Sequence, residues 1–472
     1  MSTFLNLDNL CIDPQEPLIN ESQQLNITDR DYSLLTDLYQ LTMTACYIGE
    51  GLAEKQASFE LFVRRNPENF GYLIAMGLEQ VLEYLQKLRF SPGQIKALQD
   101  TGIFDGAPDI FWDLLESIRF SGNIWAVPEG TAVFPNEPFL RVEAPLWQAQ
   151  LVETYLLNTI NYQTLIATKA ARLRDIAGEK AKLLEFGTRR AFSPQGSLWA
   201  ARAALAGGLD ATSNVLAALQ LGKKPSGTMA HALVMAINAT EGSEDKAFSA
   251  FHRYFPAAPL LVDTYDTIDA VKRLAAKVKS GEITLNGIRL DSGDLVEQSK
   301  KVRSLLPDVP ILVSGDIDEW EITRLQANGA EIDGYGLGTR LVTGQPVNGV
   351  YKLVEIDDQP VMKESKGKLT YPGRKQIFRL FAEGKVQADT LSTVGENILN
   401  TQPKMSMESL LKPMMKNGKR IQQAPQTIDQ IRKRTSTSVA SLPPETRRLE
   451  NPISIPVTIS AQLLRLTEDT RQ

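Results

Sequence analysis

Hydrophobic and polar positions follow two different patterns along this chain of 472 residues. Residues 1–28 are polar and predict an extension that precedes the fold. Between residues 72 and 85 the apolar residues recur at helical spacing, and Ser91-Pro92 marks the start of a further helix. Residues 124–142 instead alternate and are interrupted by prolines, which is typical of short strands. We therefore expect a mixed α+β domain over residues 29–145.

From residue 146 the pattern changes to short apolar runs, each followed by polar residues or Gly, with helical stretches between them. This order is typical of parallel βα units. In a closed βα barrel the segments that follow the strands share one rim, where active sites are found. We therefore expect a barrel with the active site over residues 146–345. The predicted strands are Lys182–Phe186, Leu260–Thr264, Leu285–Leu290, Ile311–Ser314 and Gly334–Leu337.

Signals for chemistry become sparse after residue 345. Residues 346–400 contain the strand-like run Gly349–Ile356, and residues 401–472 predict a helical and polar tail. The basic cluster Arg432-Lys433-Arg434 in this tail would suit a nucleic acid, but we interpret it as a solvated helix face.

Composition and charge narrow the class of protein. Lys and Arg number 51 against 56 for Asp and Glu, so the net charge of -5 favours no general binding to nucleic acid or acidic membranes. The two cysteines, Cys11 and Cys46, are too few for a disulfide framework, and no apolar run reaches the roughly 18 residues of a membrane span. The first residues lack a signal-peptide pattern, so we expect a cytoplasmic protein.

Charged side chains follow two of the predicted strands. The segment Gly287-Ile-Arg-Leu-Asp-Ser-Gly-Asp294 brings Arg289, Asp291 and Asp294 to a strand end. Two carboxylates there suit a ribose diol or a magnesium ion, although Asp, Ser and Gly equally favour a capped turn. In Gly187-Thr-Arg-Arg190, Arg189 and Arg190 suit phosphate or pyrophosphate, or alternatively a surface salt-bridge cluster.

Small residues lie at the ends of the last two predicted strands and directly after them. Their backbone N–H groups are open to a phosphate, and late barrel loops are the usual phosphate site. These residues are Ser314, Gly315, Gly336, Gly338 and Thr339.

The chain has two histidines, His231 and His252. His231 follows a Gly-Thr turn in Ser226-Gly-Thr-Met-Ala-His231, where it is either a reactive group or a structural histidine in an apolar segment.

Several of these segments, in this order, resemble the nicotinate phosphoribosyltransferases. The resemblance extends from about residue 31 to residue 380. It rests on the segments Leu35–Met43, Glu185–Arg190, Gly227–His231, Leu261–Asp266, Gly287–Leu295, Ser314–Glu319 and Gly336–Thr339, and the stretches Asn158–Arg172 and Tyr371–Phe378 are also similar to the family.

The resemblance implies a type II phosphoribosyltransferase fold, an irregular α/β barrel flanked by a mixed α+β domain to which strands of residues 346–400 return. It implies the formation of nicotinate mononucleotide and pyrophosphate from nicotinate and phosphoribosyl pyrophosphate. ATP hydrolysis would be coupled to this reaction through a phosphohistidine, in NAD salvage. Mg²⁺ is the implied metal and Mn²⁺ its alternative, with the metal ligands left open because several Asp residues qualify. A homodimer is also expected.

The resemblance further implies roles for single residues. Tyr39, Thr228 and Arg289 would contact nicotinate, and His231 would accept phosphate from ATP. Arg289 and Asp291 would act with His231 in catalysis. Phosphoribosyl pyrophosphate would be bound by Arg189, Arg190, Asp294, Ser314, Gly315, Gly336, Gly338 and Thr339.

Two alternatives stay open. Nicotinamide phosphoribosyltransferase uses a similar barrel and histidine but a neutral substrate. A non-catalytic barrel that binds a phosphorylated sugar would carry the same phosphate loops without the reaction.

Overall fold

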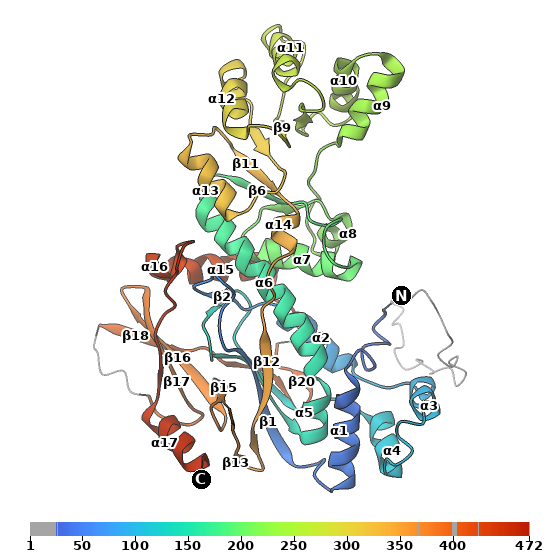
Figure 1. Cartoon of the computed structure of the whole chain (residues 1–472), viewed down its shortest axis with the longest axis vertical. Coiled ribbons are helices and arrows are strands. Elements are labelled where there is room, and N and C mark those ends of the chain that lie inside the picture. Colours follow the sequence, from blue (N-terminus) through green and yellow to red (C-terminus); the bar gives the residue numbers. More distant parts are fainter. Residues whose placement is uncertain (1–24, 26, 366–367, 399–403, 423, 472) are drawn as a thin grey trace, which may run out of the picture.

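The computed structural model describes residues 25, 27–365, 368–398, 404–422 and 424–471. Most of the predicted extension over residues 1–28, Cys11 included, lies outside the described residues. Figure 1 shows two parts, joined along the long helix α6 (Glu153–Ala177). No helix in the described ranges is both long and apolar enough to cross a membrane.

The lower part in Figure 1 is built on a seven-stranded sheet with the order β13-β12-β1-β5-β3-β19-β20. Strand β1 lies between β5 and β12, antiparallel to both, with Val63 opposite Gly349. Residues 349–356 therefore pair with the N-terminal part of the chain. The strands are β1 (Gln56–Val63), β3 (Asn123–Ala126), β5 (Pro138–Pro145), β12 (Gly349–Ile356), β13 (Gln359–Pro360), β19 (Lys412–Lys416) and β20 (Lys419–Arg420).

A four-stranded sheet of order β18-β16-β17-β21 completes this part, beside two small two-stranded sheets. Its strands are β16 (Lys375–Ala382), β17 (Lys385–Thr393), β18 (Met405–Ser409) and β21 (Val457–Ile459). One of the small sheets is formed by β2 (Leu73–Ile74) and β4 (Ala132–Val133), which are distant in sequence, and the other is the hairpin of β14 (Lys363–Ser365) and β15 (Lys368–Thr370).

The described residues after 403 are more integrated than a helical and polar tail. They contain four strands that pair within the two sheets, and the helices α15 (Ile428–Ser441), α16 (Pro444–Arg447) and α17 (Ala461–Thr470). In α15, Ile428 and Ile431 are buried. The apolar residues that pack this segment against the rest of the chain are few and widely spaced, so their pattern in the sequence is weak.

Helices α1 to α5 surround the N-terminal strands. The predicted start near Ser91 is confirmed, because Ser91 forms a capping box with Gln94 at the start of α3. The predicted helix over residues 72–85 is wrong at its start: Gly77 has φ +104°, and the buried residues before it are extended. The helices are α1 (Leu38–Gly49), α2 (Leu78–Lys87), α3 (Pro92–Asp100), α4 (Asp109–Ser117) and α5 (Leu146–Leu151).

The upper part contains a six-stranded parallel sheet with the order β7-β6-β11-β10-β9-β8. All five predicted strands are present, and the α/β fold class is confirmed. Among the described residues the edge strands β7 and β8 do not pair with each other, so the barrel is irregular rather than a closed ladder. The strands are β6 (Lys182–Glu185), β7 (Ala211–Thr212), β8 (Leu260–Leu261), β9 (Ile288–Leu290), β10 (Ile311–Val313) and β11 (Gly334–Leu337).

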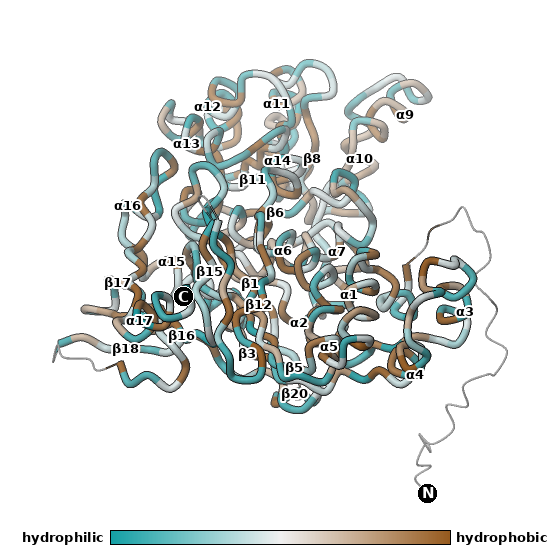
Figure 2. The backbone as a smooth tube through the Cα atoms, turned by 60° about the horizontal axis from the view of Figure 1, so that its bottom comes forward, coloured by the Kyte–Doolittle hydropathy of each residue, from teal (hydrophilic) through white to brown (hydrophobic). Residues whose placement is uncertain are grey.

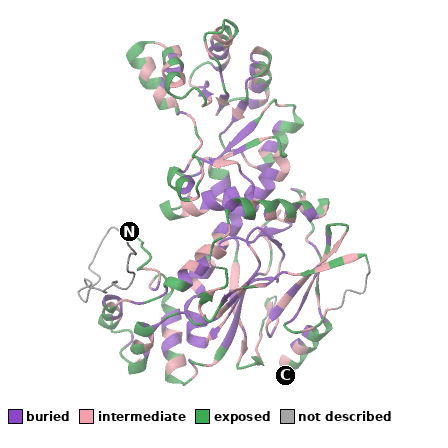
Figure 3. Cartoon of the chain, turned by 180° about the vertical axis from the view of Figure 1, so that it is seen from behind, coloured by how far each residue is buried: buried purple, intermediate pink, exposed green. Residues whose placement is uncertain are grey.

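Helices connect these strands and cover the sheet. They are α7 (Pro194–Gly207), α8 (Val215–Gln220), α9 (His231–Glu241), α10 (Glu244–Tyr254), α11 (Thr267–Lys279), α12 (Leu295–Leu305), α13 (Glu319–Ala327) and α14 (Thr339–Val342). Hydrophobic segments gather in the strands and central helices, while loops at the surface are hydrophilic (Figure 2). Figure 3 shows that α6 and α7 are largely buried, whereas α9 to α12 expose much of their surface.

Candidate active site

Three of the polar residues predicted at the strand ends, Arg289, Asp291 and Ser314, meet at one edge of the parallel sheet. Arg289 on β9 connects three segments: its Nε donates to Ser314 Oγ (2.9 Å), its Nη1 to the Met229 carbonyl (3.0 Å) and its Nη2 to Asp291 Oδ1 (3.1 Å). Ser314 Oγ also donates to Asp291 Oδ1. Because β9 and β10 are parallel neighbours, their ends bring Arg289, Asp291 and Ser314 into one cluster.

The charge on Asp291 is stabilised by this cluster. Burial alone would raise the pKa of its carboxyl, but the hydrogen bonds from Ser314 and Arg289 outweigh burial and lower the pKa below its usual range. Asp291 is therefore an anion at neutral pH, held in a fixed position next to Arg289.

His231 lies against the same cluster, at the first position of α9. Its Nδ1 lies 3.1 Å from Thr264 Oγ1, and its Nε2 lies 3.8 Å from Asp291 Oδ2. The side chain is 38% exposed, so the ring is fixed by Thr264 but remains open to a ligand.

Asp263, which follows β8, supports the turn after β9. Its Oδ2 accepts hydrogen bonds from the Asp291 backbone N–H (2.9 Å) and from Ser292 Oγ (2.7 Å). Its Oδ1 is buried without a hydrogen-bond partner in the described structure. An unpartnered buried carboxylate oxygen is costly, so a cation or donor at this point would stabilise it.

A cleft of about 710 Å³ opens beside Arg289. It is lined by Phe186, Arg189, Ser213, Val215, the segment from Pro225 to Ala230, and Arg289. Thr228 contributes its backbone and methyl group, because its hydroxyl donates to the Pro259 carbonyl. The cleft thus combines an aromatic ring with two guanidinium groups.

The predicted phosphate-binding glycines are required by close packing. Gly315 has φ +93°, and a Cβ there would lie 2.3 Å from the Asp291 carbonyl oxygen. A Cβ on Gly336 would lie 2.7 Å from the Phe186 ring. Gly338 is less confined, and Thr339, which follows it, is exposed. Of these residues, Gly315 after β10 and Thr339 after β11 are exposed at the rim.

Other predicted residues lie elsewhere or have other contacts. Tyr39 is in α1 of the lower part, away from β9, so within one chain it does not line the cleft. Asp294 is the N-cap of α12 and accepts from the N–H groups of Val296 and Glu297, as the capped-turn alternative describes. Arg190 is exposed next to Arg189 but is not a lining residue.

Several residues at the site were not predicted, among them Phe186, Asp263 and Ser213. Phe186 and Asp263 belong to segments that resemble the family. Phe186 directly follows β6 and Asp263 lies two residues after β8, and this position at a strand end is the signal that marks them. Nothing in the sequence marks Ser213, which reaches the cleft through the short strand β7.

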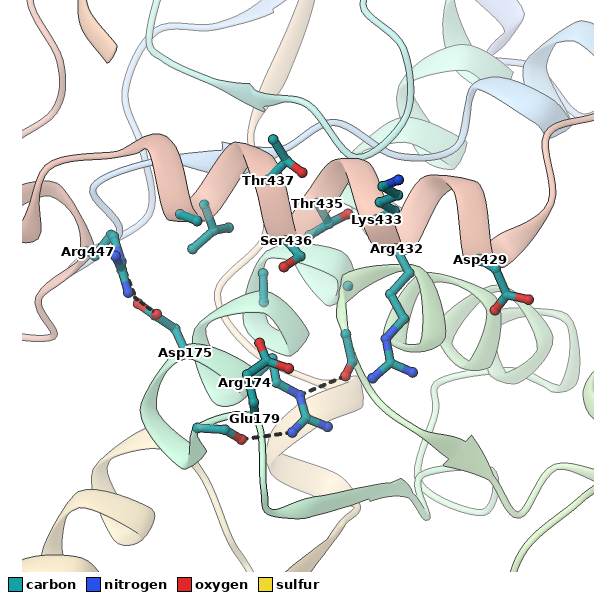
Figure 4. Close-up of a pocket in the computed structure, with 16 residues that line it drawn as sticks. Arg174, Asp175, Glu179, Asp429, Arg432, Lys433, Thr435, Ser436, Thr437 and Arg447 are labelled. Carbon is teal, nitrogen blue, oxygen red and sulfur yellow. Dashed lines mark hydrogen bonds and ion pairs between the residues drawn. The ribbon is translucent and has the colours of Figure 1, made fainter. Parts of the chain in front are cut away.

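A second cleft, of about 520 Å³, lies between the end of α6, the end of α7 and helix α15 (Figure 4). Its arginines are already paired: Asp210 accepts from Arg174 (2.7 Å) and Arg432 (2.8 Å), and Arg447 pairs with Asp175. Although burial opposes it, the hydrogen bonds from the two arginines and a backbone N–H lower the pKa of Asp210. We interpret this cleft as the seam where α15 packs.

This seam corrects the interpretation of the basic cluster as a solvated helix face. Lys433 is exposed, but Arg432 is half-buried against Asp210, and Arg434 donates to the Glu129 carbonyl (2.7 Å). The cluster holds α15 against the rest of the chain.

Comparisons with known proteins agree on one family. The model described as the nicotinate phosphoribosyltransferase family matches residues 181–312, and the models of that enzyme's N-terminal and C-terminal domains match residues 34–161 and 374–467. A nicotinate phosphoribosyltransferase of Mycobacterium tuberculosis is 41% identical over 92% of both chains. That of Bacillus subtilis is 42% identical over 80% of this chain and 79% of its own.

Solved structures agree with these matches. The crystal structure of human nicotinic acid phosphoribosyltransferase superposes with a TM-score of 0.80 at 30% identity, covering 92% of this chain and 99% of the human chain. A nicotinate-nucleotide pyrophosphorylase from Pyrococcus furiosus gives 0.72 at 25% identity, covering 89% and 99%.

Proposed function

The chain belongs to the nicotinate phosphoribosyltransferase family, and from this premise we propose that it joins nicotinate to the ribose of phosphoribosyl pyrophosphate, with release of pyrophosphate, in NAD biosynthesis. The observation that carries the proposal is the cluster of Arg289, Asp291 and Ser314, with His231 against it, in the wall of the cleft.

Nicotinate is a planar anion, and the cleft offers groups that suit it. Three of the five guanidinium N–H groups of Arg289 are bonded to protein atoms, which leaves two for a carboxylate. Phe186 supplies an aromatic ring in the same cleft, and Thr228 lines it. A neutral amide would gain less from Arg289, which favours the acid over nicotinamide.

Phosphoribosyl pyrophosphate would occupy the rim beside the nicotinate. Ser314, Gly315, Gly336, Gly338 and Thr339 would surround its 5′-phosphate. Gly315 and Thr339 are exposed and could contact it directly, whereas Ser314 and Gly336 are buried and would support the loops.

The leaving pyrophosphate would lie near Arg189 and Arg190, which are exposed after β6. Asp291, together with the exposed Asp294, would face the ribose hydroxyls.

In the reaction the pyridine nitrogen forms a bond to the anomeric carbon while the bond from that carbon to the pyrophosphate oxygen breaks. Positive charge develops on the ribose ring, as in glycosyl transfer. Asp291, whose low pKa keeps it anionic, would stabilise that charge, and Arg189 would stabilise the departing pyrophosphate.

Mg²⁺, or Mn²⁺ in its place, is the metal expected with a pyrophosphate substrate. The described residues contain no group of three potential metal ligands. Mg²⁺ usually binds through substrate phosphates and only one or two carboxylates, and Asp263, with its unpartnered Oδ1, and Asp291 fit that need. When bound, the metal would neutralise phosphate charge.

We assign ATP coupling to His231. With Nδ1–H donated to Thr264, the Nε2 lone pair is available to attack the γ-phosphorus of ATP. A P–N bond forms as the P–O bond to ADP breaks, and water later cleaves the phosphohistidine. A phosphate on Nε2 would lie beside Asp291, so its negative charge would alter the contacts of Arg289.

We further propose a homodimer in the cytoplasm. Tyr39 is 47% exposed, and Leu35 and Leu38 next to it are 42% and 52% exposed, which supports contact with another chain. Since Tyr39 lies far from β9 in its own chain, the second copy would bring it to nicotinate. The low cysteine content supports a reducing compartment.

The proposed reaction is tested by measuring nicotinate mononucleotide with and without ATP, using nicotinamide as the competing substrate. Product from nicotinate, stimulated by ATP, is the expected result. A preference for nicotinamide would favour the related amide enzyme. Binding of phosphoribosyl pyrophosphate without release of pyrophosphate would instead indicate a non-catalytic barrel.

The assignment of His231 is tested by His231→Asn, with His252→Asn on α10 as the matched control. We expect His231→Asn to abolish both the stimulation by ATP and the acid-labile label from γ-labelled ATP. Some ATP-independent transfer should persist, because the substrate-binding groups are intact. Label retained in His231→Asn would return His231 to a structural role.

A further inference from the structure

The short helix α14, with Gly338 before it and Thr343 after it, forms a single turn that is held from one side by two residues of α6. Lys169 Nζ donates to the carbonyl of Arg340 and, at 2.7 Å, to that of Thr343. Tyr162 Oη donates to the Val342 carbonyl at 3.1 Å. Three carbonyls of one short turn are thus bonded to side chains that are about 170 to 180 residues distant in sequence.

The charge of Lys169 is not neutralised in this arrangement. Lys169 is half-buried, and burial lowers the pKa of its ammonium group. It makes no ion pair among the described residues. The two carboxylates that act on it electrostatically are bonded elsewhere: Glu319 pairs with Arg172 (3.0 Å), and Asp318 pairs with Arg340 (3.4 Å).

A lysine bound only to carbonyls of a turn gives that turn both a fixed shape and a local positive charge. A free lysine side chain loses up to about 2 kcal/mol of rotamer freedom when it is fixed, so the contact needs compensation. An anion bound to the turn would provide it through Coulomb attraction. Thr339, in the same turn, is exposed and available to such an anion.

We propose that Lys169, supported by Tyr162, is a positioning residue for phosphoribosyl pyrophosphate: it holds the turn from Gly338 to Thr343 in the shape that binds the 5′-phosphate. This inference rests on the proposed function, which assigns that phosphate to this turn. Lys169 acts on the substrate through the backbone it holds and belongs to none of the groups that touch nicotinate.

The test compares Lys169→Met with Lys169→Arg, and with a control that removes an equivalent contact elsewhere. Lys300→Met is that control, because Lys300 Nζ donates to the Asn328 carbonyl (2.8 Å) beyond the end of α13. For Tyr162→Phe the control is Tyr351→Phe, which removes a hydroxyl bond to the Ala149 carbonyl (2.8 Å).

The first measurement is calorimetric titration of the full chain with phosphoribosyl pyrophosphate. Lys169→Met should bind it about tenfold more weakly, as expected for the loss of a charge-assisted hydrogen bond. Tyr162→Phe should weaken it about threefold. Lys169→Arg should recover part of the loss, and both controls should bind like the unaltered chain. In steady-state turnover, the KM for nicotinate of the Lys169 and Tyr162 variants should stay within about twofold of that of the unaltered chain.

Hydrogen exchange without substrate is the second measurement. Amides of residues 338–343 should exchange faster in Lys169→Met than in Lys300→Met. Unchanged binding and unchanged exchange would overturn the inference, as would an equal loss of affinity for nicotinate.

The two proposals fail in different ways. A chain that binds phosphoribosyl pyrophosphate through Lys169 but forms no nicotinate mononucleotide refutes the proposed function alone. A chain that forms the product with Lys169→Met unaffected refutes this inference alone. Failure of the unaltered chain to bind phosphoribosyl pyrophosphate refutes both.

Discussion

Arg289→Lys is the substitution that most directly tests the nicotinate site. The guanidinium of Arg289 uses three different nitrogen atoms to reach Ser314, Met229 and Asp291, and its side chain is only 14% exposed. An ammonium group has a single nitrogen on a flexible chain, so it cannot make these contacts and also offer two parallel N–H groups to a carboxylate.

The size of the effect follows from the hydrogen bonds that the substitution removes. A hydrogen bond to a charged group contributes about 1.5–3 kcal/mol, and burial of Arg289 leaves little screening by solvent. Loss of one of two prongs to nicotinate therefore corresponds to roughly a tenfold to hundredfold rise in KM, since 1.4 kcal/mol is about tenfold. Release of Asp291 would add a fall in kcat.

The assay is steady-state formation of nicotinate mononucleotide, with KM measured for each substrate. Arg303→Lys is the matched control. Arg303 likewise donates three hydrogen bonds within the fold, to two carbonyls (2.9 and 3.0 Å) and a carboxylate (2.5 Å), but it lies on α12, outside the cleft lining. A near-normal KM for nicotinate in Arg289→Lys would refute the assigned role. An equal loss in both variants would indicate damage to the fold instead.

Three further predictions concern other parts of the molecule. Thr339→Ala should weaken phosphoribosyl pyrophosphate binding by about threefold to tenfold and leave KM for nicotinate unchanged, as calorimetry and kinetics would show. Gly315→Ala should lower kcat by more than its loss of stability, followed as the melting temperature, would explain. The reason is that φ is +93° and the new Cβ would displace Asp291. Glu137→Gln should raise the free energy of unfolding in urea titrations at pH 8, and this gain should shrink as the pH falls. Burial and the charge of Asp389 raise the pKa of Glu137 in the folded chain, so the unaltered chain loses stability as the pH rises through that pKa. A gain that grows toward acid pH would contradict this.

The position of the polar residues at the strand ends could be predicted from the sequence, because it depends only on the order of residues within short segments. An apolar run followed by polar residues places those residues at the carboxyl end of a strand, and parallel strands share that end. Arg289, Asp291 and Ser314 come from two such runs, and the pairing of β9 with β10 brings them together. The capping box at Ser91 is equally local, since all its partners lie within four residues.

Contacts between distant segments could not be predicted in this way. The start of α2 is set by the left-handed Gly77 and by packing of the residues before it. The spacing of apolar residues along the sequence reveals neither of them. From the sequence, the carboxylate of Asp294 could either bind a ribose or magnesium ion or cap a helix. Only the structure shows that it accepts hydrogen bonds from the N–H groups of α12. The pairing of β19 with β3 joins residues almost three hundred positions apart.

Helix α6 shows why such contacts matter for function. Many of its buried residues are polar, and the sequence alone does not show which polar side chain meets which partner. On one side Thr164 and Thr168 accept from the backbone N–H groups of Met76 (3.2 Å) and Ile74 (2.8 Å) in the lower part. One residue further on, Lys169 binds the turn of Gly338 to Thr343 at the barrel rim. Since a helix is stiff over a single turn, we expect a shift of the segment around β2 to displace this turn as well, so that the lower part of the molecule would help to shape the phosphate site proposed above.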